Sequence, residues 1–254
     1  MRRVNVAGWL FIAAVTVVVE ACVRAFDLRG SVAAPSESLR ALAEGLASGA
    51  LLGEIGTTLQ AFVEGLVLAV VVGVAVGVLI GSSRTLRDAA SVVIEFLRPI
   101  PAVALIPLAI LFLGLGIPMR RFVVAYAAVW PILVNTLYGV RGSDRILDDV
   151  ARTSGATGAA RLFRVKLPAA LPSIATGVRV GASIGLLACV TAEYLNGTGG
   201  IGSYMHRQET AFQLPELYAA VILVGALGYG VNQLLRAAQR RYVFWVGEER
   251  AGAR

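Results

Sequence analysis

Six long apolar stretches constrain the fold of this chain more than any other feature of the sequence. Each holds about 20 or more mostly apolar residues, the length that an α-helix needs to cross the hydrocarbon core of a bilayer. They run over residues 8–26, 57–81, 89–113, 122–140, 170–195 and 217–240. Only 15% of the 254 residues are charged and 57% are hydrophobic, whereas a soluble domain is about a quarter charged. The sequence therefore predicts an all-α integral membrane protein with about six transmembrane helices and no separate soluble domain.

Proline and glycine add detail to two of these stretches. Residues 98–101 (RPIP) interrupt the third stretch, and Pro107 interrupts it again. Because proline removes a backbone donor and kinks a helix, we expect this span to be broken or bent. The second stretch contains four glycines that permit close helix packing: Gly65, Gly73, Gly77 and Gly81.

The distribution of basic residues among the loops predicts how the chain is oriented. Fifteen Lys and Arg residues lie in the N-terminal tail, in loops 82–88 and 141–168 and from residue 236 to the C-terminal end, against five in the intervening loops. Since basic residues collect in cytoplasmic loops, we expect both termini and loop 141–168 inside the cell, which requires an even number of spans. The net charge of +7 is explained in the same way, so no nucleic-acid partner is expected. On the outer side, Pro35 and regularly spaced leucines predict a short amphipathic surface helix.

Loop 141–168 combines an apolar face with basic flanks. Its first half places four apolar residues at helical spacing, namely Ile146, Leu147, Val150 and Ala151. Gly155 can end that helix, and a second short helix then brings Leu162, Phe163 and Val165 near one another. Such a pair of helices suits the groove of a partner protein. A solvated loop that contacts only lipid head groups explains the same charges equally well.

The same loop resembles the cytoplasmic EAA loop of ABC-importer permeases of the binding-protein-dependent type. That pattern is Glu-Ala-Ala, three residues, Gly, about nine residues, and then an aliphatic residue, any residue, Leu and Pro. The corresponding residues here are Asp149, Val150, Ala151, Gly155 and the ending 165–168 (VKLP). Asp149 departs from the pattern by a shorter acidic arm, and Val150 departs from it by added bulk.

Other segments are similar to the nitrate/sulfonate/taurine branch of these permeases. They are residues 97–101 (LRPIP), 106–114 (IPLAILFLG), 130–136 (WPILVNT) and 192–193 (AE) leading to 199–202 (GGIG). The resemblance implies the type I importer permease fold in a bacterial inner membrane. It also implies an N-terminal helix with an outer segment over residues 1–56, a permease core over 57–242 and a cytoplasmic tail over 243–254.

The resemblance also implies partners and a class of solute. Two permease copies would form the path, a cytoplasmic ATPase dimer would drive it, and an extracytoplasmic solute-binding protein would deliver the solute, all in contact with membrane lipid. The solute would be a small anion such as a sulfonate, taurine, nitrate or bicarbonate. A pyrimidine precursor or an aromatic acid is the alternative. The residues that would couple to the ATPase are Asp149, Val150, Ala151, Gly155, Leu162, Phe163, Leu167 and Pro168.

Charges inside the predicted spans mark candidates for the translocation path, because each costs at least ~2.5 kcal/mol to insert. Glu193 precedes a Gly-rich polar stretch that cannot be a continuous lipid-facing helix. The path candidates are Glu193, Asn196, Gly199 and Gly200. A buried structural ion pair is the other interpretation of Glu193. For Glu95 and Arg98, three residues apart, we expect a pair on one helical face.

The sequence contains no pattern that indicates catalysis by the chain itself. The phosphate loop G-x-x-x-x-G-K-[ST] does not occur, so ATP hydrolysis is expected from a partner chain. No nucleophile lies beside a base and no residues have metal-ligand spacing, so neither a cofactor nor a metal is expected. A secondary transporter without an ATPase is the rival class, but it would leave the pattern in loop 141–168 unexplained, and we see no internal repeat.

Overall fold

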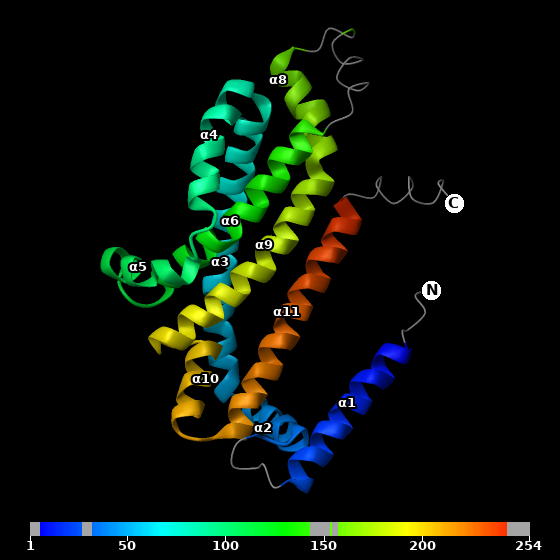
Figure 1. Cartoon of the computed structure of the whole chain (residues 1–254), viewed down its shortest axis with the longest axis vertical. Coiled ribbons are helices and arrows are strands. Elements are labelled where there is room, and N and C mark those ends of the chain that lie inside the picture. The colour runs from blue at the N-terminus through cyan, green and yellow to red at the C-terminus, as the bar shows by residue number, and fades with distance from the viewer. Residues whose placement is uncertain (1–5, 27–31, 143–152, 154–156, 243–254) are drawn as a thin grey trace. The chain divides into compact units, whose positions relative to one another are not determined.

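The computed structural model describes residues 6–26, 32–142, 153 and 157–242 (Figure 1). All regular elements in those ranges are helical, which confirms the predicted all-α class. They are α1 (Val6–Ala25), α2 (Pro35–Ala47), α3 (Ala50–Ser82), α4 (Arg84–Leu97), η2 (Ala102–Leu105), α5 (Ile106–Leu113), α6 (Ile117–Arg141), α8 (Gly158–Arg161), η3 (Leu162–Lys166), α9 (Leu167–Asn196), α10 (Ile201–Thr210) and α11 (Leu214–Tyr242).

Four helical stretches of the described chain are long and apolar enough to cross a membrane. They are α3, α6, η3 with α9, and α11, and they lie on four of the six predicted spans. A fifth predicted span corresponds to α4 followed by η2 and α5, which meet the same criterion together as a bent pair. The remaining predicted span lies on α1, whose 20 residues equal in length what a crossing helix requires.

The predicted break in the third apolar stretch is present between α4 and η2. The two halves are bent by 82°, at the point where two prolines deny the helix its backbone donors. The carbonyl of Leu97 accepts hydrogen bonds from the Tyr126 hydroxyl at 2.7 Å and from the Ile100 N–H at 3.2 Å. Pro107 does not interrupt the span a second time, because it lies in the first turn of α5, where no intrahelical donor is needed.

The chain divides into two compact units, which are described separately. One comprises residues 1–58 and 193–226, and the other residues 59–192 and 227–254. In the first unit α2 begins at Pro35, as predicted. The Glu20 carboxylate of α1 accepts hydrogen bonds from the backbone N–H of Ser36 at 3.0 Å and from its hydroxyl at 2.8 Å. An acidic side chain thus satisfies a free amide at the start of α2.

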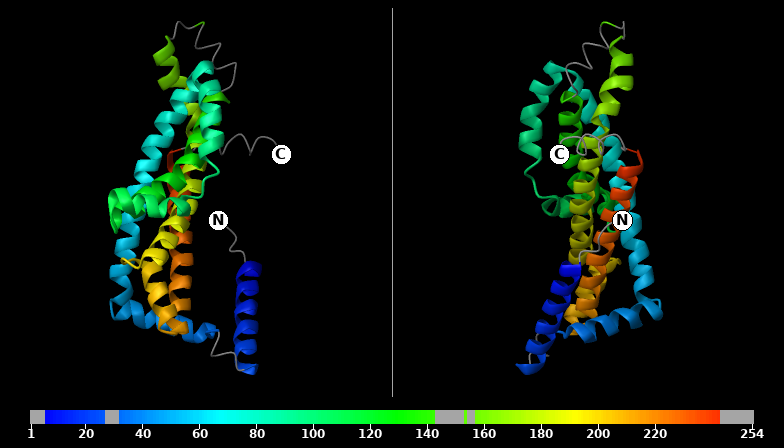
Figure 2. Two further views of the ribbon diagram at one scale, coloured as in Figure 1. Left: turned by 60° about the vertical axis from the view of Figure 1, so that its left-hand side comes forward. Right: turned by 90° about the vertical axis from the view of Figure 1, so that its right-hand side faces the viewer.

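In the second unit, α6 packs between α3 and α9, as can be followed in Figure 2. The glycines of α3 face α6 at such short range that side chains would not fit. A Cβ added at Gly65 would lie 2.6 Å from the Cβ of Val124, and one at Gly77 would lie 2.7 Å from the Cβ of Thr136. On α9, Gly177 is equally close to Asn135 at 2.8 Å. The predicted role of the α3 glycines in close helix packing is therefore confirmed.

This packing predicts opposite effects for two glycine-to-alanine substitutions. Gly77→Ala should lower the free energy of unfolding by about 1–3 kcal/mol, because the methyl group would overlap Thr136 and the Leu133 carbonyl. At Gly230 in α11, an added Cβ would meet no described residue within 4 Å beyond its own helical turn. Gly230→Ala should therefore leave the free energy of unfolding unchanged or raise it by up to about 1 kcal/mol.

Unfolding can be followed by the labelling of buried Cys189 with a thiol-reactive dye, in a Cys22→Ser background because Cys22 is exposed. Equal midpoints for the two alanine variants would contradict the close contact between α3 and α6.

Candidate functional site

The residues predicted to contact an ATPase lie partly within the described chain. Asp149, Val150, Ala151 and Gly155 are outside the described residues. Leu162 and Phe163 begin η3, a π-helical turn, while Leu167 and Pro168 open α9. The side chain of Phe163 is 66% exposed, and Arg164 and Lys166 follow it on the same turn. An exposed aromatic ring therefore lies among basic side chains just ahead of a membrane-spanning helix.

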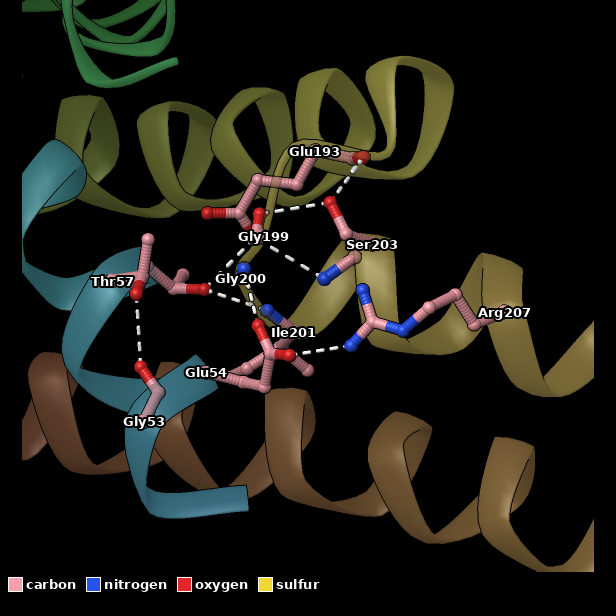
Figure 3. A network of polar contacts seen from close by, with 11 residues as sticks. Gly53, Glu54, Thr57, Glu193, Gly199, Gly200, Ile201, Ser203 and Arg207 are labelled. Atoms are coloured by element: carbon pink, nitrogen blue, oxygen red, sulfur yellow. Dashed lines mark hydrogen bonds and ion pairs between the residues drawn. The ribbon is translucent and has the colours of Figure 1, made fainter. Parts of the chain in front are cut away.

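The four residues predicted to line a path lie where α9 ends, and Figure 3 shows three of them, Glu193, Gly199 and Gly200. Glu193 is completely buried and Asn196 is the last residue of α9. Gly199 and Gly200 then turn the chain, with φ angles of 97° and 93° that disfavour any side chain. A Cβ at Gly200 would also overlap the Glu193 carboxylate. The turn directs the chain into α10.

Side chains from α3 and α9 bind the free amides at the start of α10. The pairs are Gly200 N–H with Glu54 Oε2 at 2.5 Å, Ile201 N–H with Thr58 Oγ1 at 2.9 Å, and Gly202 N–H with Glu193 Oε2 at 3.2 Å. The first amides of a helix have no intrahelical acceptor and carry the positive end of its dipole. Two carboxylates and a hydroxyl therefore cap α10 (Figure 3).

The caps are bound to one another as well as to α10. The Thr58 hydroxyl donates to Glu193 Oε2 at 2.8 Å while it accepts from Ile201. The Ser203 hydroxyl lies 2.8 Å from each of two carbonyl oxygens, those of Glu193 and Gly199. This cluster of buried, hydrogen-bonded groups, which we call the α10 cap, holds the Gly-rich turn in one conformation.

An ion pair borders the α10 cap on its exposed side. The second carboxylate oxygen of Glu54 lies 2.5 Å from the Arg207 guanidinium, which is also 5.9 Å from the centre of the Tyr204 ring. Burial raises the pKa of Tyr204, the negative charge of Glu216 raises it further, and Arg207 opposes the shift. The phenol is therefore neutral at physiological pH, and Arg207 faces an uncharged ring.

The sequence indicated only part of this cluster. It identified Glu193 and the two glycines but missed Glu54, Thr58 and Arg207. Glu54 and Thr58 are four residues apart and so lie on one face of α3, a signal that was available before the structure. No sequence pattern links Glu54 to Arg207, because they are 153 residues apart. The Glu193 carboxylate accepts hydrogen bonds from the Thr58 hydroxyl and from the Gly202 amide.

Thr58 offers a test of the α10 cap. Thr58→Val keeps the shape of the side chain but removes the acceptor of Ile201 N–H and one of the donors to Glu193. We expect a loss of about 1–3 kcal/mol in the free energy of unfolding, measured by Cys189 labelling. Thr58→Ser retains the hydroxyl and should lose much less. If the Val variant were as stable as the Ser variant, the hydroxyl would have no part in holding α10.

Comparison with known proteins agrees with the membrane fold. Residues 69–246 match the family model described as the binding-protein-dependent transport system inner membrane component. That segment contains most of the apolar spans, loop 141–168 and the Gly-rich turn.

Several curated proteins are similar to this chain. A probable ABC transporter permease protein of Brucella abortus strain 2308 is 33% identical over 98% of this chain and 94% of its own length. The taurine transport system permease protein of Escherichia coli K12 is 31% identical over 66% of this chain and 61% of its own. The nitrate import permease protein of Synechocystis is 35% identical over 61% of this chain and 56% of its own. A Methanocaldococcus jannaschii protein assigned as an ABC transporter permease is matched over 62% of its length.

Solved structures show the same fold. A chain in inward-facing structures of the MetNI methionine ABC transporter superposes with a TM-score of 0.69 at 19% identity, over 76% of this chain and 95% of that one. A chain in a crystal structure of an amino acid ABC transporter gives a TM-score of 0.62 at 17% identity, over 79% and 97%. The chain therefore belongs to the family of inner membrane components of binding-protein-dependent transport systems, the ABC-importer permeases, in the branch of the nitrate, sulfonate and taurine permeases.

Proposed function

We propose that this chain is the transmembrane permease subunit of an ABC importer for a small anionic solute. The observation that carries the proposal is the family match over residues 69–246, which includes the whole of loop 141–168. The nature of the solute is supported by the names of relatives, which refer to taurine, nitrate, bicarbonate and aliphatic sulfonates. Each of these solutes is an anion or carries an anionic group.

The partners follow from the same family membership. The family is described as depending on a binding protein, which supports an extracytoplasmic solute-binding protein as the donor of solute. A cytoplasmic ATPase dimer would supply the free energy, since the chain lacks a phosphate loop. Six spans are few for an alternating-access path, so a second copy would complete it. We place the complex in a bacterial inner membrane, in contact with lipid and with both termini in the cytoplasm.

The segment formed by α8 and η3 is our candidate for ATPase contact. Phe163 is a large, exposed aromatic residue at the start of the η3–α9 stretch, ahead of the apolar segment 170–195. The basic residues beside it are suited to carboxylates on a partner. Aromatic residues that enter a partner's pocket often carry most of the binding free energy. Phe163 would thus be the anchor, with the residues from Asp149 to Gly155 forming the rest of the contact.

Two alternatives remain open to experiment. An importer for a pyrimidine precursor or an aromatic acid would have the same ATPase and a different solute. A secondary transporter would need no ATPase and would use an ion gradient instead. Purification of the tagged chain from its own membranes, followed by assay of vanadate-sensitive ATP hydrolysis, separates the second alternative from the proposal.

Uptake into proteoliposomes separates the first alternative, an importer for a different solute, from the proposal. The proposal expects ATP-dependent uptake of taurine, methanesulfonate, nitrate or bicarbonate when the solute-binding protein is supplied. ATP-dependent uptake of a pyrimidine precursor or an aromatic acid, without uptake of these anions, would support the first alternative instead. Uptake that is driven by an ion gradient without ATP would overturn the proposal.

Phe163 and Gly155 test the ATPase contact. Phe163→Ala should reduce the affinity for the ATPase by about tenfold or more, as expected for loss of an aromatic anchor. Gly155→Pro should leave the protein in the membrane but abolish stimulated ATP hydrolysis. Phe212→Ala removes a ring that is 87% exposed in a different loop and should leave ATPase binding unchanged. Normal binding by Phe163→Ala, or an equal loss in Phe212→Ala, would refute the assignment.

We propose Glu193, Asn196, Gly199 and Gly200 as the outer end of the translocation path. The support is their position at a helix break, which membrane proteins tolerate where it is covered by protein or lines a cavity. Glu193→Gln removes the charge but keeps a carbonyl acceptor for the α10 cap. We expect uptake to fall by about tenfold or more, as for loss of one charged hydrogen bond, with an unchanged unfolding midpoint. Near-normal uptake would remove Glu193 from the path and leave it a structural role alone.

A further inference from the structure

A cavity of about 360 Å³ lies in the second unit, between the break after α4 and the middle parts of α6 and α9. Pockets for small molecules start near this volume. Four side chains with polar or cationic groups line it, and the rest of its wall is mostly apolar. The four are Arg98, Tyr126, Trp130 and Asn135. Val180 and Ile184 close the cavity from α9.

Arg98 is the only charged residue among those that line this cavity. Within the described ranges no carboxylate lies within 4 Å of its guanidinium, so the predicted pair with Glu95 is not formed. No hydrogen bond from the Arg98 side chain to another described residue is present either. An arginine within a membrane span is costly unless it is paired or faces a polar cavity. The guanidinium of Arg98 is therefore available to pair with an anion bound in the cavity.

The cavity lies near the middle of the bilayer by two separate estimates. Arg98 follows Arg84, the first residue of α4, by 14 positions, or about 21 Å of helix at 1.5 Å per residue. Trp130 lies 13 positions after the start of α6 and 11 before its end, or about 20 Å and 17 Å. In a hydrocarbon core about 30 Å thick, these lengths put Trp130 near the midplane and Arg98 about 9 Å from the face opposite Arg84. An interior anion would relieve the charge of an arginine at this depth.

The other polar groups complement a small anion. The indole Nε1 of Trp130 is buried without an acceptor in hydrogen-bond geometry among the described residues. Tyr126 packs edge-on against that indole, with ring centres 5.6 Å apart, and its hydroxyl already donates to Leu97. The Asn135 amide is oriented by a 2.8 Å hydrogen bond to the Pro131 carbonyl. The cavity thus combines a cation, an N–H donor and two aromatic rings.

We propose that this cavity is a binding site for the transported solute within the permease. Arg98 would pair with the sulfonate, carboxylate or nitrate group, and the Trp130 N–H would donate to the same oxygens. The rest of a small organic anion would lie against the rings of Tyr126 and Trp130. The assignment of the anion as the transported solute rests on the proposed function, whereas the anion site itself rests on the cavity. Solute would then be selected in the membrane as well as by a binding protein.

Equilibrium binding to the full chain in phosphatidylcholine nanodiscs tests the site. Trp9→Phe and Trp245→Phe leave Trp130 as the only tryptophan, so its emission reports on the cavity. The probes are taurine, methanesulfonate and nitrate at constant ionic strength, with choline chloride as the blank. Retention of radiolabelled taurine measures binding in Trp130→Phe, where the emission is lost.

We expect saturable binding of at least one anion. Arg98→Gln should weaken the affinity about tenfold or more, as expected for loss of a charged hydrogen bond. Arg98→Lys should weaken it less. Arg179→Gln is the matched control. Arg179 is another arginine within a span, but it lines a separate cavity with Asn232, so affinity should be unchanged. Protection of Cys189 from labelling shows that each variant is folded.

Absence of saturable binding in the folded protein, unchanged affinity in Arg98→Gln, or an equal loss in Arg179→Gln would overturn the site. A second set of nanodiscs containing phosphatidylglycerol distinguishes solute from lipid: affinity should not change, and competition by this lipid would assign the cavity to a lipid phosphate instead. The binding assay contains no ATPase. Failure to recover an ATPase complex would therefore refute the proposed function without affecting this result, and the reverse also holds.

Discussion

In hydrocarbon, a backbone N–H or C=O without a partner costs several kcal/mol, so a helix that is broken within a membrane needs other groups at the break. Two breaks of the described chain are supplied in this way, and the start of α2 outside the spans has a similar cap. Tyr126 and the Ile100 N–H bind the Leu97 carbonyl after α4, and Glu20 binds the first turn of α2. The α10 cap binds three successive amides. At the bends of this permease, side chains thus supply hydrogen bonds that the helix backbone no longer makes.

The helices and their breaks could be predicted because their causes are local. Apolar length locates the spans, the prolines at 99 and 101 locate the bend, and Pro35 locates the start of α2. The partners at the breaks could not be predicted, because they come from distant segments. Glu54 meets Gly200 across 146 positions, and Tyr126 meets Leu97 across 29. The front of the predicted coupling motif, from Asp149 to Gly155, lies outside the described residues and stays a prediction.

Two ionisable residues in or beside the apolar spans illustrate different ways of accommodating a charge. Glu193 is fully buried, and its carboxylate accepts from a hydroxyl and from a helix N-terminal amide. Arg98 lies beside a cavity, with no carboxylate of the described chain in ion-pair range. The insertion cost of a charge applies to both. Their surroundings differ, because Glu193 is bound into the α10 cap, whereas Arg98 faces a cavity.

The interlocked glycine face of α3 has a mechanical consequence. From Gly65 to Gly81 the backbone of α3 lies directly against α6, over a length of about 24 Å. Without long side chains between them to change rotamer, the two helices cannot slide or roll past one another by small steps. The pair of helices should then move as a rigid body, so that a displacement at one end reaches the other end nearly undiminished. Relative movement is left to the segments on either side of the breaks.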